Sequence, residues 1–158
     1  MGINRGKQFE KEIQNQFEKI EDISVDRLYD VTTGYKNQNN PCDLIVFAYG
    51  TLNYFECKAI HGNTLNFKSH IRQNQIDKLL AKSKIPRVNA GIICWFIDCD
   101  ETVYIDINYI QQLKDSGKKS YNVKYDFLYP HVWQIMGDKR KVFFDYYLED
   151  LLEDLRYE

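Results

Sequence analysis

The sequence has no apolar run of about 18 residues, the length that a membrane-crossing helix needs. It also has no N-terminal stretch with the pattern of a secretory leader, so we expect a cytoplasmic protein with no membrane partner. No internal repeat, low-complexity tract or linker divides the chain. Together these absences predict a single domain that spans residues 1–158.

The cysteines are too few and too scattered to suggest a metal cage or a disulfide framework. There are four of them, and no two form a Cys-x-x-Cys pair. Each lies in or beside an apolar stretch, where a reduced thiol behaves as a small apolar side chain. We therefore expect buried thiols, and neither structural zinc nor disulfides, at Cys42, Cys57, Cys94 and Cys99.

The composition that remains is that of a globular protein with a substantial core. Of 158 residues, 44% are hydrophobic and 15% are aromatic, which excludes a disordered chain. The formal net charge of −2 argues weakly against a nucleic-acid partner, but the charge is uneven. Residues 58–90 hold seven basic side chains and one acidic one, whereas residues 141–158 hold two basic and six acidic. The basic segment could face phosphates, or it could be the ordinary solvated face of a helix.

Hydrophobic periodicity predicts helices and strands in mixed order. Phe9, Ile13 and Phe17 recur at helical spacing, and the continuous apolar run at 91–97 is typical of a central strand covered on both faces. Loops are expected at 32–41 and 59–68. The predicted helices cover 5–20, 69–83, 108–114 and 146–155, and the predicted strands cover 23–29, 43–48, 53–58, 91–97 and 102–105. This order favours the α/β class, with a mixed sheet flanked by helices.

The segment from Asp43 to Lys58 carries the strongest functional signal. An apolar strand begins at an acid, turns near Gly50, and is followed by a second strand that carries Glu56 and Lys58. Alternate side chains of a strand share a face, so Glu56 and Lys58 point the same way. A turn centred near Gly50 and Thr51 would place Asp43 opposite Lys58 and diagonal to Glu56, within reach of one shared metal ion.

Two acids and a lysine on one sheet face suit a metal-dependent phosphodiesterase. The carboxylates would hold Mg²⁺, the metal would activate water, and the lysine would support the developing charge. The alternative is that these charges are solvated strand ends, because the spacing Asp-x(12)-Glu-x-Lys also arises by chance. In that case Lys58 would form only a surface ion pair.

Other residues could complete such a site. Glu10 lies at the edge of the first helical stripe and could lean over the sheet, or could simply be solvated. Gln75 could hydrogen-bond the attacking water or Lys58, and the carbonyl of Cys57 could reach a hard metal ion. Candidate contacts to DNA are Arg5, Lys7, Thr33, Lys68 and Arg72.

Five segments, in order along the chain, resemble Holliday-junction resolvases of the RecU type. Asn4-Arg5-Gly6-Lys7-Gln8-Phe9-Glu10 resembles their opening, and Asp43…Glu56-Cys57-Lys58 matches the core of the wider PD-(D/E)xK nuclease superfamily. The later segments that resemble them are 63–67 with 70–76, then Gly91-Ile92-Ile93, and then Gly117-Lys118-Lys119-Ser120.

The resemblance implies a restriction-endonuclease-like fold, a homodimer, and divalent-metal cleavage of four-way DNA junctions. It assigns Glu10, Asp43 and Glu56 to the metal site, Lys58 to catalysis, and Gln75 to the helix glutamine that supports such sites. RecU proteins carry a long stalk before the catalytic aspartate, and here only residues 30–42 fill that place. In this respect the chain is more similar to the compact archaeal resolvases, which puts its junction selectivity in doubt.

We therefore expect a structure-selective DNA endonuclease, a Holliday-junction resolvase of recombination and repair. Mg²⁺ is the expected cofactor, with Mn²⁺ as a substitute, and the resemblance implies 5′-phosphate products. A dimer is expected because one domain holds one acid-acid-lysine set, whereas resolving a junction needs two cuts. A restriction-type or nicking endonuclease of the same fold would instead cut linear duplex at a fixed sequence. A noncatalytic DNA-binding regulator is the third alternative, although it would need no acids near phosphate.

Overall fold

The computed structural model describes residues 4–28 and 40–157, and a six-stranded sheet lies at its centre. Strands β3 and β5 run parallel, and the other neighbouring pairs of the sheet run antiparallel. The predicted mixed sheet is therefore confirmed. In spatial order the strands are β1 (Ser24–Arg27), β2 (Leu44–Ala48), β3 (Thr51–Ile60), β5 (Val88–Phe96), β6 (Glu101–Asp106) and β8 (Val132–Gln134).

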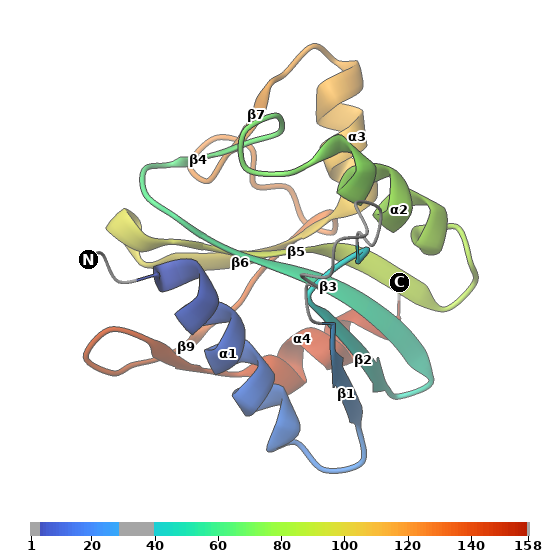
Figure 1. The fold of residues 1–158 in the computed structure, drawn as a ribbon, viewed down its shortest axis with the longest axis vertical. Coiled ribbons are helices and arrows are strands. Elements are labelled where there is room, and N and C mark those ends of the chain that lie inside the picture. The colour runs from blue at the N-terminus through green and yellow to red at the C-terminus, as the bar shows by residue number, and fades with distance from the viewer. Residues whose placement is uncertain (1–3, 29–39, 158) are drawn as a thin grey trace, which may run out of the picture.

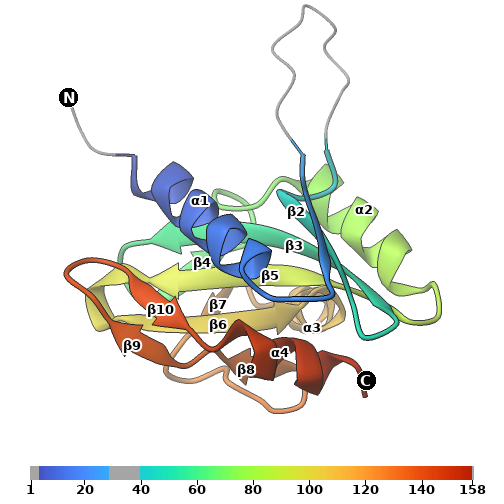
Figure 2. The same cartoon turned by 90° about the horizontal axis from the view of Figure 1, so that it is seen from below.

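Helices cover both faces of this sheet, as Figures 1 and 2 show. Helices α1 (Arg5–Glu18) and α4 (Leu148–Leu155) lie on one face, and α2 (Gln73–Ser83) and α3 (Ile107–Asp115) lie on the other. A two-stranded ribbon accompanies each layer, and a 3-10 turn at Ile97–Cys99 follows β5. The ribbon of β4 (Thr64–Asn66) and β7 (Ser120–Asn122) lies beside α2 and α3, and that of β9 (Gly137–Lys139) and β10 (Phe144–Tyr146) lies beside α1.

The core forms two apolar layers because the central strand is covered on both sides. Ile92, Cys94 and Phe96 of β5 pack in the layer under α2 and α3, whereas Ile93 and Trp95 pack in the layer under α1 and α4. This alternation explains the continuous apolar run in the sequence. All four cysteines are free thiols; Cys42, Cys57 and Cys94 are buried as predicted, whereas Cys99 is only partly buried.

Helix α1 packs across the sheet through its predicted stripe. Phe9, Ile13 and Phe17 are fully buried, and the Phe17 ring stacks on Phe55 of β3 with 5.4 Å between centroids. The side chain of Asn4 accepts a hydrogen bond from the backbone N–H of Lys7 (3.1 Å), which caps the helix at its start.

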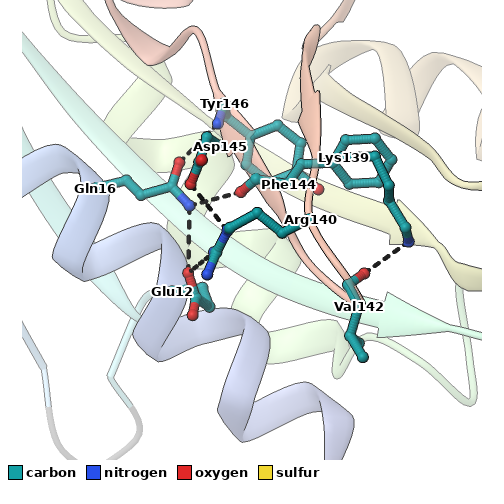
Figure 3. Close-up of polar contacts among 8 residues, drawn as sticks. All are labelled: Glu12, Gln16, Lys139, Arg140, Val142, Phe144, Asp145 and Tyr146. Atoms are coloured by element: carbon teal, nitrogen blue, oxygen red, sulfur yellow. Dashed lines mark hydrogen bonds and ion pairs between the residues drawn. The ribbon is translucent and has the colours of Figure 1, made fainter.

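The polar face of α1 binds the β9–β10 ribbon (Figure 3). Gln16 donates to the carbonyl of Phe144 and accepts from the backbone N–H of Tyr146, each at 2.8 Å. Arg140 pairs with Glu12 (2.6 Å) and with Asp145 (2.9 Å). These contacts join the two ends of the chain, so the first helix is held by the ribbon as well as by the core.

Several predicted boundaries were wrong. The segment 59–68 is not a loop, because β3 continues to Ile60 and β4 follows. The predicted helix 69–83 begins only at Gln73, because the side chain of Asn66 accepts from the backbone N–H groups of Lys68 and Ser69 and holds a turn there. Strands β8, β9 and β10 were not predicted.

The apolar tail is core. Leu148, Leu151, Leu152 and Leu155 of α4 are all buried against the sheet, so the apolar stripe of this helix is covered within the domain. Within residues 4–28 and 40–157, no helix combines the length and the apolar character that crossing a bilayer requires.

Candidate active site

A polar cavity of about 250 Å³ opens where β2 and β3 part, between the N-terminal ends of α1 and α2. It brings together side chains from four separate parts of the sequence, which only the tertiary fold unites. The residues that line it are Asn4, Gly6, Lys7, Glu10, Asn40, Cys42, Asp43, Glu56, Cys57, Lys58, Ala59, Arg72 and Gln75. The cavity therefore contains each predicted catalytic residue and each predicted metal-site residue.

Asp43 is positioned by both strands of the hairpin. Its backbone N–H donates to the carbonyl of Phe55 (3.1 Å), and its Oδ2 accepts from the backbone N–H of Cys57 (2.8 Å). The strand ladder pairs Leu44 with Phe55, and its continuation brings Asp43 beside Glu56. The predicted register, with Asp43 opposite Lys58, was wrong.

The turn explains this error in register. Ala48 pairs with Thr51, so only Tyr49 and Gly50 form the turn, and both have positive φ (54° and 79°). Positive φ at both positions is the signature of a two-residue turn that matches the twist of the strands. Tyrosine is not expected in that conformation, so the sequence suggested a turn centred one residue later.

Glu56 is held in an unusual state for a carboxyl group. It is 2% exposed, and it accepts a hydrogen bond of 2.5 Å from Nε2 of Gln75 in α2. Burial raises the pKa of Glu56 well above its usual value, and the neighbouring Asp43 carboxyl raises it further, while Lys58 opposes the shift. The site thus disfavours a second negative charge unless a proton or a cation balances it.

Lys58 lies on the same face of β3 as Glu56. Tyr54 and Ile60 pack under α2 and α3, whereas Phe55 and Cys57 pack under α1, so the even-numbered side chains share one face. The side chain of Lys58 is half-buried and lines the cavity. It forms no ion pair with the residues that the structure describes, so its ammonium group is available to an anion in the cavity.

The carbonyl of Cys57 points to the same opening as Asp43. The carbonyl of Phe55 accepts a hydrogen bond from the backbone N–H of Asp43, and the backbone N–H of Cys57 donates one to the Asp43 carboxylate. The odd-numbered residues of β3 therefore direct their backbone polar groups toward β2. The first residue of β2, Leu44, pairs with Phe55, so β2 has no residue that pairs with β3 beyond that point. The Cys57 carbonyl therefore lies beside the Asp43 carboxylate.

Glu10 lies at the border of the cavity, and its ion-pair partner Arg27 is not among the described residues that line it. Glu10 of α1 lines the cavity and pairs with Arg27 of β1, with 3.0 Å between Oε1 and Nε. Both side chains are mostly buried, at 16% and 22% exposed. Sequence reasoning missed Arg27, because only a contact between distant segments reveals it. The metal role of Glu10 stays a prediction.

The predicted DNA contacts divide into groups. Lys7 and Arg72 line the catalytic cavity, whereas Lys68 lines a different cavity. Arg5 hydrogen-bonds Gln8 (2.8 Å) and lies over the Phe143 ring, 5.7 Å from its centroid. Thr33 lies outside the described residues. Cations of segment 58–90 thus line two different cavities, and Arg87 donates to the carbonyl of Gly50 instead.

The donors that meet in the cavity fit a hard divalent cation. Asp43 and Glu56 offer two carboxylates and Cys57 a carbonyl, and a cation would relieve the conflict that raises the pKa of Glu56. Mg²⁺ is usually held by one or two carboxylates and keeps several waters. The described part of the chain contains no cluster of three or more Asp, Glu, His or Cys side chains suited to a metal, so Glu10, Asp43 and Glu56 do not form such a cluster in this structure.

Comparison with known proteins gives a similarity in structure alone. No family model and no curated protein sequence matches the chain. Among solved structures, the chain is similar to Hjc, a Holliday junction resolvase from the archaeal hyperthermophile Archaeoglobus fulgidus. The TM-score is 0.48 and the identity 13%, over 66% of this chain and 78% of that one. At this level of likeness, function must be argued from the residues of the cavity.

Proposed function

We propose that this protein is a metal-dependent DNA endonuclease that cuts branched DNA, and that it acts as a Holliday-junction resolvase. The observation that carries the proposal is the meeting of Asp43 and Glu56 in one cavity with Lys58 and Gln75. Solvated strand ends would not be buried, and a protein that only binds DNA would gain nothing from acids beside phosphate.

Each side chain of the cavity has a distinct task in this proposal. Asp43 and Glu56 hold Mg²⁺, or Mn²⁺ in its place, together with the carbonyl of Cys57. Gln75 fixes the orientation of Glu56, and the ammonium group of Lys58 donates to the phosphate or to the attacking water. When bound, the ion would lower the pKa of a water and offset negative charge on the phosphate.

The preference for junctions rests on the ordered resemblance to RecU-type resolvases. Five segments of the sequence carry that resemblance, and the same resemblance suggests a homodimer that leaves 5′-phosphate ends. Two active sites related by a twofold axis would match a four-way junction, which has twofold axes of its own. The apolar face of the tail helix α4 is buried within its own domain, so a dimer would have to use a surface other than this leucine stripe.

The test is cleavage of matched four-way, forked and linear DNA, with Mg²⁺, with Mn²⁺ and with EDTA. We expect paired cuts in the four-way substrate with either metal and none with EDTA. Cleavage of linear duplex at a fixed sequence would favour a restriction-type or nicking enzyme instead. Binding to all three substrates without any metal-dependent cut would refute the nuclease and leave a DNA-binding regulator. Light scattering should give a mass near twice 18.8 kDa.

A further inference from the structure

A second, larger cavity lies on the α2 and α3 face, and we call it the lysine cavity. Its volume is about 640 Å³, and four lysines line it together with uncharged residues. None of the described residues that line it is acidic. They are Asn66, Phe67, Lys68, Ile71, Gln73, Lys114, Gly117, Lys118 and Lys119.

The fold builds this cavity from two distant segments. In the β4–β7 ribbon, Asn66 pairs with Ser120, and the backbone N–H of Phe67 donates to the carbonyl of Lys119 (3.0 Å). Lys68 and Lys119 are thereby brought to the same end of the ribbon, although 51 positions separate them in the sequence. The Asn66 side chain fixes the turn that carries Lys68, through hydrogen bonds of 2.9 Å. Backbone hydrogen bonds therefore fix the positions from which Lys68 and Lys119 extend.

Two of the four ammonium groups are already engaged, and two are not. Lys118 pairs with Asp126, whose side chain is 8% exposed, and Lys114 donates to Oε1 of Gln73. Lys68 and Lys119 are exposed and form no ion pair with the residues that the structure describes. The first two lysines stabilise the walls, and the second two leave positive charge at the mouth of the cavity.

The lysine cavity and the catalytic cavity are both lined by residues of one short segment, 66–75. Lys68 and Gln73 line the first, whereas Arg72 and Gln75, from the same short segment, line the second. Helix α2 begins between them with no side-chain cap at Arg72, so its first backbone N–H groups add positive partial charge at the boundary. An anionic chain that leaves the catalytic cavity over this boundary would next meet Lys68 and Lys119.

We propose that the lysine cavity binds backbone phosphates of the same DNA, next to the phosphate that is cut. The proposal rests on the proposed nuclease function and adds a second contact that positions the substrate. Lysine ammonium groups act as point charges on phosphate and read no sequence, so this contact sets affinity and orientation without choosing bases. It gives Lys119 a role in phosphate binding that the sequence alone did not suggest.

The test is the salt dependence of DNA binding without metal. Affinity for a labelled four-way junction is measured in EDTA over a range of salt for wild type and for Lys68→Ala/Lys119→Ala. If each lysine neutralises one phosphate, the slope of log affinity against log salt should shrink by about 1.4 to 1.8. The matched control is Lys19→Ala/Lys141→Ala, which removes two exposed lysines from the α1 side and should keep the wild-type slope. Circular dichroism checks that each variant folds.

The outcomes separate this inference from the proposed function. Binding in EDTA needs no chemistry, so a protein that cuts nothing could still show the reduced slope and support the lysine cavity. Wild-type cleavage together with an unchanged slope in the double variant would overturn the cavity assignment alone. Inorganic phosphate that binds the cavity while the DNA slope stays unchanged would also overturn it.

Discussion

The two cavities on either side of segment 66–73 use charge in opposite ways. The catalytic cavity is small and holds carboxylates that are largely shielded from water, with Glu56 at 2% exposed. The lysine cavity is more than twice as large, and its unpaired charges are exposed. The catalytic cavity holds two carboxyl groups close together, which raises the pKa of Glu56, whereas the lysine cavity places its unpaired ammonium groups where water can solvate them.

This difference separates chemistry from binding. Burying a carboxylate beside another is expensive, so a fold that does it gains something other than stability. Exposed lysines cost little and can contribute to affinity one phosphate at a time. Substitutions in the catalytic cavity should therefore act steeply on the rate, and those in the lysine cavity gradually on affinity.

The largest effect is expected for Asp43→Asn. It removes a charge that the metal needs while keeping the shape of the side chain, and changes to residues that merely support metal ligands already cost about 10- to 100-fold. Cleavage should fall by more than about 100-fold, with DNA binding unchanged. Single-turnover rates and a binding titration measure the two. Asp26→Asn, an exposed acid on β1, is the control, and equal rates for both variants would break the comparison.

Gln75→Ala should have the next largest effect. The variant leaves Glu56 without its 2.5 Å hydrogen bond and lets it turn away from Asp43. Because Gln75 supports a ligand without being one, we expect a loss of about 10- to 100-fold, part of which added Mg²⁺ restores. Rates measured against Mg²⁺ concentration test this. Asn74→Ala, at the neighbouring helix position, should behave as wild type, and a Gln75→Ala variant with wild-type metal dependence would remove Gln75 from the site.

Glu10 lies at the border of the catalytic cavity, so a substitution there tests how far the metal site extends from Asp43 and Glu56. If it helps to hold the ion, Glu10→Gln should raise the Mg²⁺ concentration needed for half-maximal rate by about tenfold. Glu12→Gln removes an acid of the same helix that pairs with Arg140 and should leave the metal requirement unchanged. If Glu10→Gln lowers only the unfolding free energy, Glu10 serves as the structural partner of Arg27 and no more.

The smallest effect is expected in the pH dependence of the unfolding free energy of the metal-free protein. Glu56 has a pKa raised from its usual 4.5, so the folded state keeps a proton that the unfolded state loses. Its contribution to the unfolding free energy should therefore fall as pH rises above about 4.5, by at most about 1.4 kcal/mol per pH unit. Urea unfolding at several pH values measures this. Glu56→Gln should flatten the slope and Lys68→Ala should not, so identical slopes for wild type and Glu56→Gln would contradict the assignment.

Local patterns in the sequence were enough to predict much of the catalytic cavity. Glu56 and Lys58 share a face because strand periodicity is local, and the Phe9, Ile13 and Phe17 stripe predicted α1 for the same reason. The residue of β3 that lies opposite Asp43 could not be predicted, because the strand register depends on a two-residue turn with Tyr49 at positive φ. Strands of three residues, such as β4 and β7, are too short to show an alternation.

Contacts between distant segments account for what the sequence could not show. Arg27 reaches Glu10 only because β1 lies beside α1, and Lys68 and Lys119 line one cavity only because β4 pairs with β7. The charge balance of segment 58–90 left open whether its cations face phosphates or are an ordinary solvated helix face, and the fold places Lys58 and Arg72 in one cavity and Lys68 in another. The composition gives the number of charged side chains, but the pairing of strands determines which of them line the same cavity.

The most direct test of the central claim measures binding and cleavage of one four-way junction side by side, for wild type and Glu56→Gln. In Mg²⁺, wild type should cut the junction and should lose that activity in EDTA. Glu56→Gln should bind with the wild-type salt slope and cut more than about 100-fold slower, because it removes a buried metal ligand and no surface cation. Near-wild-type cleavage by Glu56→Gln, or equal cleavage by wild type in EDTA, would contradict the account.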